Sequence, residues 1–195
     1  MPACGAFYLR KDEEVMGMLI LGAVLALLAA GCLSVRQRLA AARENVRSAM
    51  GQACLRLASG FDALEGLMDR LADFAPEEAA KMRQKLAARR AEAEEKMDVR
   101  TLEQNARLLS KTSIPALGLA LQSAEEPLRE LADDAACCLR MLRTGCLIYN
   151  DCADKYNRLL EKLPAKLVGR MMGFRKAEIL SRETIESLIR QEISQ

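Results

Sequence analysis

The sequence predicts an all-α protein: an N-terminal transmembrane helix followed by an antiparallel four-helix bundle with long first and last helices. Ala, Leu, Glu, Lys and Arg dominate the 195 residues, which include three Tyr, four Phe and no Trp, and this composition favours helices over strands. Apolar residues recur every three or four positions over long stretches, as they do on one face of a helix. One uncharged apolar stretch is also long enough to cross a bilayer.

The apolar stretch comprises residues 15–35 and contains no charged side chain. A helix rises about 1.5 Å per residue, so this stretch spans about 30 Å, the thickness of one bilayer core. We therefore expect a transmembrane helix here, with the lipid bilayer as its partner. Gly22, Ala26 and Ala30 recur every four residues, a spacing that lets two membrane helices approach closely. Because Gly and Ala are common in such helices, the spacing alone leaves homo-oligomerisation open.

The distribution of positive charge predicts the orientation of this helix. Two basic residues, Arg10 and Lys11, precede the stretch, and four follow it closely: Arg36, Arg38, Arg43 and Arg47. Basic residues near the ends of a transmembrane helix favour the cytoplasmic side. Residues 1–14 are therefore expected as a short extracytoplasmic tail, and the rest of the chain at the cytoplasmic face of a bacterial inner membrane.

A lipoprotein is the alternative interpretation of the same region. Residues 29–32 read Ala-Ala-Gly-Cys, which is similar to a lipoprotein cleavage box, and lipidation at Cys32 would place the bundle outside the cytoplasm. Signal peptides normally begin with basic residues, whereas positions 12–14 are acidic, and the apolar stretch is longer than a typical signal core. These two features favour the transmembrane helix.

Helical periodicity continues after the membrane. Apolar residues spaced by three or four positions predict one long amphipathic helix over 35–74, and Pro76 followed by two Glu residues marks the start of a second, charged helix that reaches Arg100. Thr101 and Gln104 have the spacing of a capping box, which predicts a short third helix that ends before Ser113 and Pro115.

The clearest periodicity in the chain runs from Leu128 to Leu163, where Pro164 stops the last long helix. These amphipathic helices can bury their apolar faces only against one another, so residues 36–174 are expected to form the bundle. After Phe174, residues 175–195 combine apolar positions at helical spacing with balanced charge. We expect a C-terminal amphipathic helix that packs back on the bundle or binds another chain.

A repeated dipeptide lies near the end of the last long helix. Tyr149 and Asn150 are followed seven residues later by Tyr156 and Asn157, and then by Pro164, Gly173 and Phe174. Together with the N-terminal apolar stretch and the long helix after it, this pattern resembles the LemA family. The resemblance implies a helical bundle on a single-pass membrane anchor, and it assigns no reaction. The chain departs from the family pattern at Met50, Ser59, Gly60, Glu65 and Gly66, and over 77–143.

The spacing of the repeat has a structural consequence. Seven residues are about two helical turns, so the two Tyr lie on one face of the helix and the two Asn lie together on a neighbouring face. As structural residues, each Tyr would bury its ring and each Asn would bond a neighbouring helix or the following turn. As a binding surface, the same residues would receive a partner helix or peptide, and the sequence does not separate these interpretations.

Composition also narrows the class of function. The chain contains no His, the commonest general base and metal ligand, and no nucleotide-binding, zinc-protease or serine-nucleophile motif. Its net charge of +2 provides no large field for nucleic acid. The seven Cys form no C-x-x-C pair and are expected as core-filling thiols. We therefore predict no catalytic, cofactor-binding or metal-binding residue, no nucleic-acid partner, and a function exerted by binding other proteins.

Overall fold

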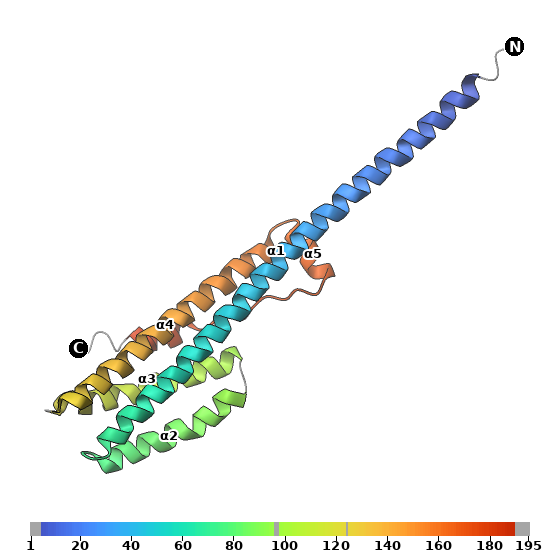
Figure 1. Ribbon diagram of the computed structural model, residues 1–195. Helices are drawn as coiled ribbons and strands as arrows, with labels where there is room; N and C mark the ends of the chain where they lie inside the picture. The colour runs from blue at the N-terminus through green and yellow to red at the C-terminus, as the bar shows by residue number, and fades with distance from the viewer. Residues whose placement is uncertain (1–4, 96–97, 124, 190–195) are drawn as a thin grey trace. The chain divides into compact units, whose positions relative to one another are not determined.

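The computed structural model describes residues 5–95, 98–123 and 125–189, and within these ranges all regular secondary structure is helical. The described residues form six helices (Figure 1): α1 (Gly5–Leu71), α2 (Pro76–Glu95), α3 (Val99–Gln122), α4 (Glu126–Glu161), α5 (Ala165–Met171) and α6 (Arg182–Ile189). The predicted all-α class is confirmed. The described chain divides into two compact units, which fall within Met1–Ala41 with Arg158–Arg175 and within Ala42–Asn157 with Lys176–Gln195.

The N-terminal part of α1 belongs to the first unit and contains the predicted transmembrane stretch. From Met16 onward, α1 is the one helix among the described residues that is long and apolar enough to cross a membrane. Its large apolar side chains are uncovered; Leu19 is 70% exposed and Leu27 is 74% exposed. Residues 5–14 already belong to α1, so the predicted boundary at residue 14 is not an end of the helix, and residues 1–4 lie outside the described chain.

In the second unit, ion pairs join α1 and α2 in an antiparallel arrangement. Arg83 pairs with Asp69, and Arg90 pairs with both Glu65, at 2.6 Å, and Asp62, at 2.8 Å. Residues later in α2 therefore meet residues earlier in α1. The reversal is made at residues 72–75, and α2 begins at Pro76, as the sequence predicts.

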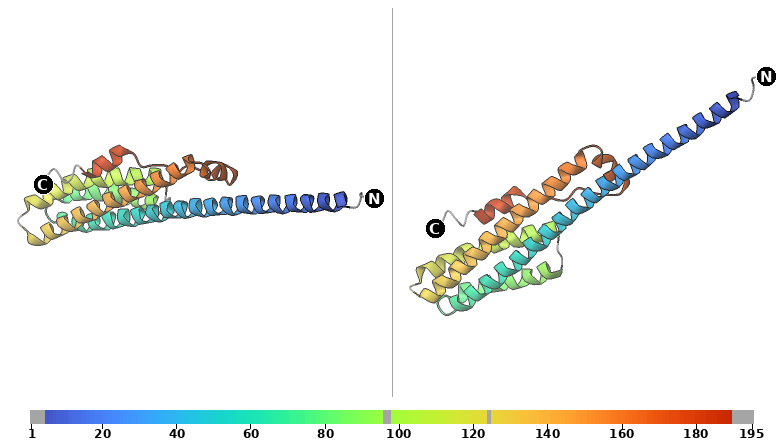
Figure 2. Two further views of the ribbon diagram at one scale, coloured as in Figure 1. Left: turned by 90° about the horizontal axis from the view of Figure 1, so that it is seen from above. Right: turned by 45° about the horizontal axis from the view of Figure 1, so that its top comes forward.

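Close packing joins α1 to α4 and α3 within the same unit. A Cβ atom placed on Gly145 of α4 would lie 3.4 Å from the Cα atom of Ala53 and 2.9 Å from Cδ of Arg56. The guanidinium of Arg56 donates a 2.9 Å hydrogen bond to the carbonyl of Met141. A Cβ atom on Gly60 would meet the side chain of Leu109 in α3 at 3.1 Å. Figure 2 shows α3 against α2 and α6, with which it is in contact.

The core of this unit combines large aliphatic residues with many alanines. Leu64, Leu67, Leu102 and Leu109 are at most 1% exposed, and so are alanines on three helices, among them Ala53, Ala106, Ala116, Ala120, Ala135 and Ala153. Small residues at facing positions let helix axes approach closely, whereas the leucines fill the space between them. This packing explains why a chain with so few aromatic residues has a core.

The third predicted helix differs most from the structure. Helix α3 begins at Val99 and not at Thr101, because the carboxylate of Asp98 accepts a 2.7 Å hydrogen bond from the Thr101 backbone N–H and caps the helix. It does not end before Ser113, but runs through Pro115 to Gln122. A proline inside a helix costs about 3 kcal/mol. Burial of Ala116, Leu117 and Ala120 beyond it offsets that cost.

Two further differences lie after α4, which ends at Glu161, close to the predicted stop at Pro164. Helix α5 was not predicted, because seven residues are too short to establish a periodicity. The start of the helix predicted over 175–195 is also wrong: residues 174–181 are not helical and α6 begins at Arg182, while residues 190–195 lie outside the described chain. We call residues 174–181 the extended segment.

Candidate functional site

The two Asn residues of the repeat on α4 hold the backbone of the extended segment. The Asn150 side chain donates a 3.0 Å hydrogen bond to the Leu180 carbonyl and accepts one of 2.9 Å from the Leu180 N–H. Asn157 does the same at Ala177, donating at 3.0 Å to its carbonyl and accepting at 2.8 Å from its N–H. Each amide therefore satisfies both backbone groups of one residue, and we call each of these pairs of bonds an Asn clamp.

The seven-residue spacing of the repeat fits this geometry. Seven residues of α-helix advance by about 10.5 Å. The three steps from Ala177 to Leu180 advance by about 10 Å when the chain is extended. Two Asn side chains that lie two turns apart on α4 can therefore bond residues three positions apart in an extended chain. That chain runs antiparallel to the helix.

The two Tyr residues are buried beside the clamps. Tyr149 is 2% exposed, and its hydroxyl donates a 2.7 Å hydrogen bond to the Glu178 carbonyl. Burial, with a smaller contribution from the negative charge of Glu178, raises the pKa of Tyr149 to about 12. Tyr156 is also 2% exposed; burial raises its pKa, and the charge of Arg43 opposes that rise. Both rings thus lie in the core, as the structural interpretation of the repeat expects.

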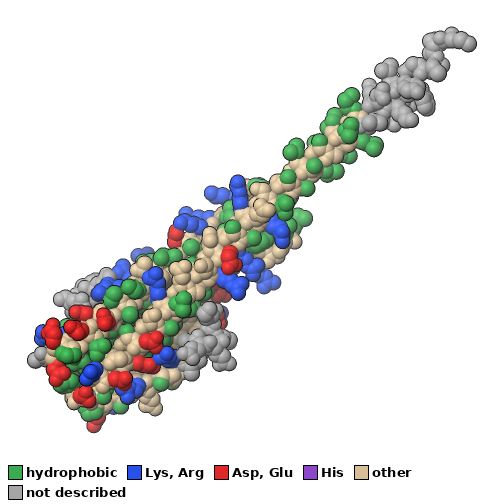
Figure 3. Space-filling view, in the orientation of Figure 1, with side chains coloured by type: hydrophobic (Ala, Val, Ile, Leu, Met, Phe, Trp, Pro, Cys, Tyr) green, Lys and Arg blue, Asp and Glu red, His purple; other side chains and the backbone are tan. Residues whose placement is uncertain are grey.

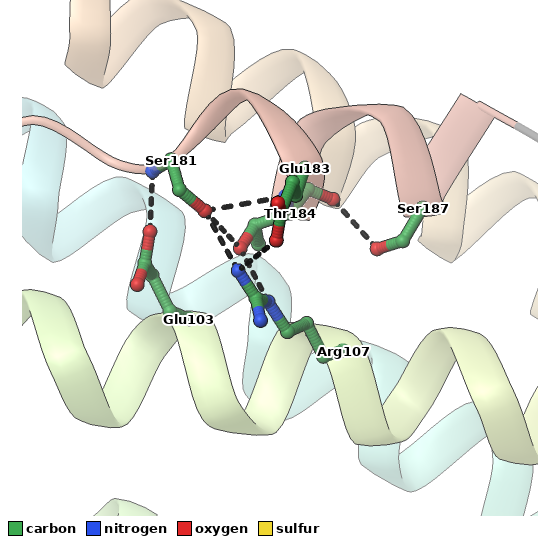
Figure 4. Close-up of polar contacts among 6 residues, drawn as sticks. All are labelled: Glu103, Arg107, Ser181, Glu183, Thr184 and Ser187. Atoms are coloured by element: carbon green, nitrogen blue, oxygen red, sulfur yellow. Dashed lines mark hydrogen bonds and ion pairs between the residues drawn. The ribbon is translucent and has the colours of Figure 1, made fainter.

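A second group of polar side chains, on α3, holds the start of α6 (Figure 4). Arg107 donates from Nε to the Thr184 hydroxyl at 2.8 Å and from Nη2 to the Ser181 hydroxyl at 2.9 Å. The Glu103 carboxylate accepts a hydrogen bond from the Ser181 backbone N–H. One helical turn further along α3, the Ser110 hydroxyl donates to the Ser187 carbonyl at 2.6 Å. Thr184 is fully buried by this arrangement.

The α3 group was missed in the sequence. Its signal is the series Glu103, Arg107, Ser110, which places polar side chains at i, i+4 and i+7 on one face of the helix. The Ser181 and Thr184 pair has the spacing of a helix N-cap and marks the start of α6. Neither signal identifies its partner, because the bonded residues lie 74 and 77 positions apart in the sequence.

The other predicted site residues shape the ends of α5 in the first unit. The Pro164 carbonyl accepts hydrogen bonds from the N–H groups of Leu167 and Val168 at the start of the helix. At its end, Gly173 has a φ of +71°, and the Phe174 N–H donates a 3.0 Å bond to the Gly169 carbonyl. A left-handed glycine after the last turn is a common way to end a helix. Pro164, Gly173 and Phe174 therefore have a structural role around α5.

The cysteines are less buried than predicted. Among the described cysteines only Cys146 is buried, and that burial raises the pKa of its thiol to about 12; Cys54, Cys137, Cys138 and Cys152 are partly exposed, and Cys32 is exposed on α1. A thiol with a raised pKa is a poor nucleophile at neutral pH. Among the described residues, no three Cys, Asp or Glu side chains are grouped so that they could hold a metal ion.

The Tyr–Asn repeat and the α3 group thus hold the chain's own residues 177–187. The repeat bonds backbone groups of residues 177, 178 and 180, whereas the α3 group bonds backbone groups of Ser181 and Ser187 and the hydroxyls of Ser181 and Thr184. An Asn clamp bonds only backbone N–H and C=O groups. Binding by the two clamps therefore depends on the distance between two backbone residues of the bound segment and not on the side chains of those residues. Comparisons of the chain with protein-family models, with curated proteins and with solved structures gave no match.

Proposed function

We propose that this protein is a LemA-like helical scaffold that one transmembrane helix anchors to a bacterial inner membrane. In this proposal its soluble part lies at the cytoplasmic face and acts by binding other proteins and not by catalysis. The observation that carries the proposal is the exposure of apolar side chains along residues 16–33 of α1, from which Leu21, Leu25 and Leu28 project with 58–61% of their surface uncovered. Lipid hydrocarbon can cover such a surface without leaving backbone N–H and C=O groups unsatisfied, because these groups are already hydrogen-bonded within the helix.

The proposed architecture of the soluble part is an antiparallel four-helix bundle of α2, α3, α4 and the part of α1 after the apolar stretch. Its support is the opposed register of the α1–α2 ion pairs, the close approach of α1 and α4 at Ala53 and Gly145, and the packing of Leu109 of α3 near Gly60. The LemA resemblance rests on the Tyr–Asn repeat with its trailing Pro and Gly-Phe. Those residues have definite tasks in this fold, which is consistent with their forming one motif.

Site-specific labelling tests the proposed orientation. Gln104 is exposed on α3, so a cysteine placed there in a variant whose seven native cysteines are replaced will react with a membrane-impermeant maleimide wherever the reagent reaches it. We expect labelling in permeabilised spheroplasts and none in intact spheroplasts. Labelling in intact spheroplasts would overturn the cytoplasmic orientation. A cysteine at Gln37, close to the predicted membrane surface on the same side, should give the same pattern and serves as the control.

The lipoprotein alternative predicts a different mature chain. In this alternative the Cys32 thiol would carry a diacylglycerol, cleavage before Cys32 would remove residues 1–31, and the amine that cleavage frees would be acylated. Intact mass spectrometry of the protein purified from membranes separates the two forms directly. We expect the mass of the uncleaved chain, and the mass of a lipidated chain that begins at Cys32 would establish the alternative.

A further inference from the structure

Helix α5 leaves an apolar stripe exposed. Its buried side consists of Ala165, Val168 and Gly169, whereas Leu167 and Met171 lie one turn apart on another side and are 59% and 87% exposed. Leu163 before the helix and Met172 after it are also exposed. A soluble surface rarely places this many large apolar side chains together without something to cover them.

Basic side chains accompany this stripe. Lys166 and Arg170 lie one turn apart on α5, each next in sequence to an exposed apolar residue, and Lys162 lies between α4 and α5. Residues 36–41 and 158–175, all in the first unit, contain seven Lys or Arg (Arg36, Arg38, Arg158, Lys162, Lys166, Arg170 and Arg175) and one acidic residue, Glu161, a net charge of +6. The whole chain has a net charge of +2, so the remainder carries −4 and hides this concentration in the overall composition.

The place of α5 in the first unit brings these side chains close to the end of the apolar stretch. A Cβ atom on Gly169 would lie 3.7 Å from Cδ1 of Leu39 on α1, and Leu39 is fully buried. Leu39 is four residues beyond the end of the stretch at residue 35, which is about 6 Å along a helix. Figure 3 shows Lys and Arg side chains, in blue, gathered where the apolar part of α1 ends.

We propose that α5 and its flanks form a second membrane-contact surface, in which Leu163, Leu167 and Met171 enter the interfacial layer of the bilayer and the neighbouring basic side chains bind anionic lipid headgroups. This inference rests on the proposed anchoring of α1. An apolar face bordered by Lys and Arg is the pattern of helices that lie in a membrane interface. The bilayer is favoured over a protein partner because the surface belongs to the same compact unit as the transmembrane stretch, and because the inner leaflet is negatively charged.

Single tryptophans test this proposal in the full-length chain, which has no Trp of its own. We would reconstitute Met171→Trp, Leu25→Trp and Leu55→Trp separately into vesicles that contain phosphatidylglycerol, with or without lipids brominated on the upper acyl chain. Leu25 reports on the proposed transmembrane stretch, and Leu55, 71% exposed on α1, is the matched exposed control. We expect quenching at Met171→Trp to approach that at Leu25→Trp and to exceed that at Leu55→Trp several-fold.

The outcomes separate the two proposals. Quenching at Leu25→Trp without quenching at Met171→Trp would support the anchor and overturn the second membrane contact. A blue-shifted but unquenched Met171→Trp emission would mean that protein, and not lipid, covers the tryptophan, and it would overturn the second contact as well. No quenching at Leu25→Trp would instead overturn the anchor itself. In the Met171→Trp chain, the substitutions Lys166→Gln and Arg170→Gln should lower the quenching in phosphatidylglycerol vesicles to its value in pure phosphatidylcholine. Unchanged quenching would refute the role of headgroup charge.

Discussion

At the scale of single residues, the Asn clamps explain how a short polar motif determines the path of a distant segment. Asn150 and Asn157 are half-buried, and each uses its donor and its acceptor on one backbone residue. A half-buried peptide group without a partner costs roughly 1–3 kcal/mol. The clamps therefore allow residues 177 and 180 to leave regular secondary structure without leaving their N–H and C=O groups unsatisfied.

Substitution of one clamp should release one residue of the extended segment. We expect Asn150→Ala to remove the protection of the Leu180 amide against hydrogen exchange and to lower the free energy of unfolding by roughly 1–3 kcal/mol. Asn150→Asp keeps the acceptor, so the Leu180 amide should remain protected, although the carboxylate faces the Leu180 carbonyl. Asp151→Ala, which removes only an exposed ion pair with Lys155, is the control and should change stability by less than about 0.5 kcal/mol. Full protection of Leu180 in Asn150→Ala would contradict the clamp.

Tyr149 predicts a pH dependence with a definite sign. Its pKa rises from 10.0 to about 12 on folding, so the folded state favours the protonated hydroxyl. The resulting stabilisation is complete below pH 10 and is lost as the pH rises through about 12. Tyr149→Phe lacks this titration, and below pH 10 it should be less stable than the natural chain by about 1 kcal/mol, the value of one hydrogen bond. Denaturant unfolding of both proteins should show this difference shrinking from pH 10 upward; a constant difference would argue against the buried hydroxyl.

At the scale of secondary structure, strong periodicity predicted the helices well, and tertiary contacts decided what it could not. The start of α2 at Pro76 and the end of α4 near Pro164 follow from local stereochemistry. The continuation of α3 through Pro115 depends on buried residues beyond the proline, which no local rule includes. Residues 177–180 belong to the stretch 175–195 whose apolar spacing predicted a helix, but they are not helical, and Asn side chains of α4 bond the backbone groups of Ala177 and Leu180.

In the candidate site, too, the sequence predicted local features but not tertiary contacts. The Tyr–Asn spacing identified the residues, and the burial of both Tyr rings agrees with their structural interpretation. The partner of the Asn pair could not be predicted, since Asn can bond a helix, a turn or an extended chain equally well. The α3 group was missed because it bonds residues 74 to 78 positions away in the sequence, and the surface around α5 was missed because α5 itself was not predicted.

Glycines in α1 and α4 provide a test of helix packing. A Cβ atom on Gly145 would lie 2.9 Å from Arg56 and 3.4 Å from the Ala53 backbone, whereas nothing lies within 4 Å of such an atom on Gly51. We expect Gly145→Ala to lower the free energy of unfolding by about 1–3 kcal/mol through crowding. Gly51→Ala should raise it by up to about 1 kcal/mol, because Ala has the higher helix propensity. Equal effects of the two substitutions in denaturant unfolding would mean that α1 and α4 are not in close contact there.

At the scale of the whole molecule, the uneven distribution of apolar surface and charge is the main feature. The first unit has exposed leucines and a concentration of basic residues, whereas the second unit buries its leucines and alanines in a core. A net charge near zero therefore describes neither unit. In a chain of this kind, charge counted by segment predicts more than charge counted overall.

The proposed anchor makes membrane retention depend on the apolar stretch, residues 15–35. Arg at the centre of a transmembrane helix costs about 2.5–3.5 kcal/mol, so Leu21→Arg together with Leu25→Arg should shift the chain from the carbonate-resistant membrane pellet to the soluble or aggregated fraction. Leu55→Arg, at an exposed site outside the stretch, should leave the protein in the pellet. Retention of the doubly substituted chain in the pellet would indicate that another part of the protein holds it there.

The clamp between Asn157 and Ala177 also closes a loop in the chain. The residues between these two positions include all of α5, and the two ends of this loop are joined by the hydrogen bonds between Asn157 and Ala177. Closing a loop costs an entropy that grows only with the logarithm of its length. Insertions at residues 162–163, between α4 and α5, should therefore cost the second unit little free energy, because the clamp at Ala177 tolerates a longer loop.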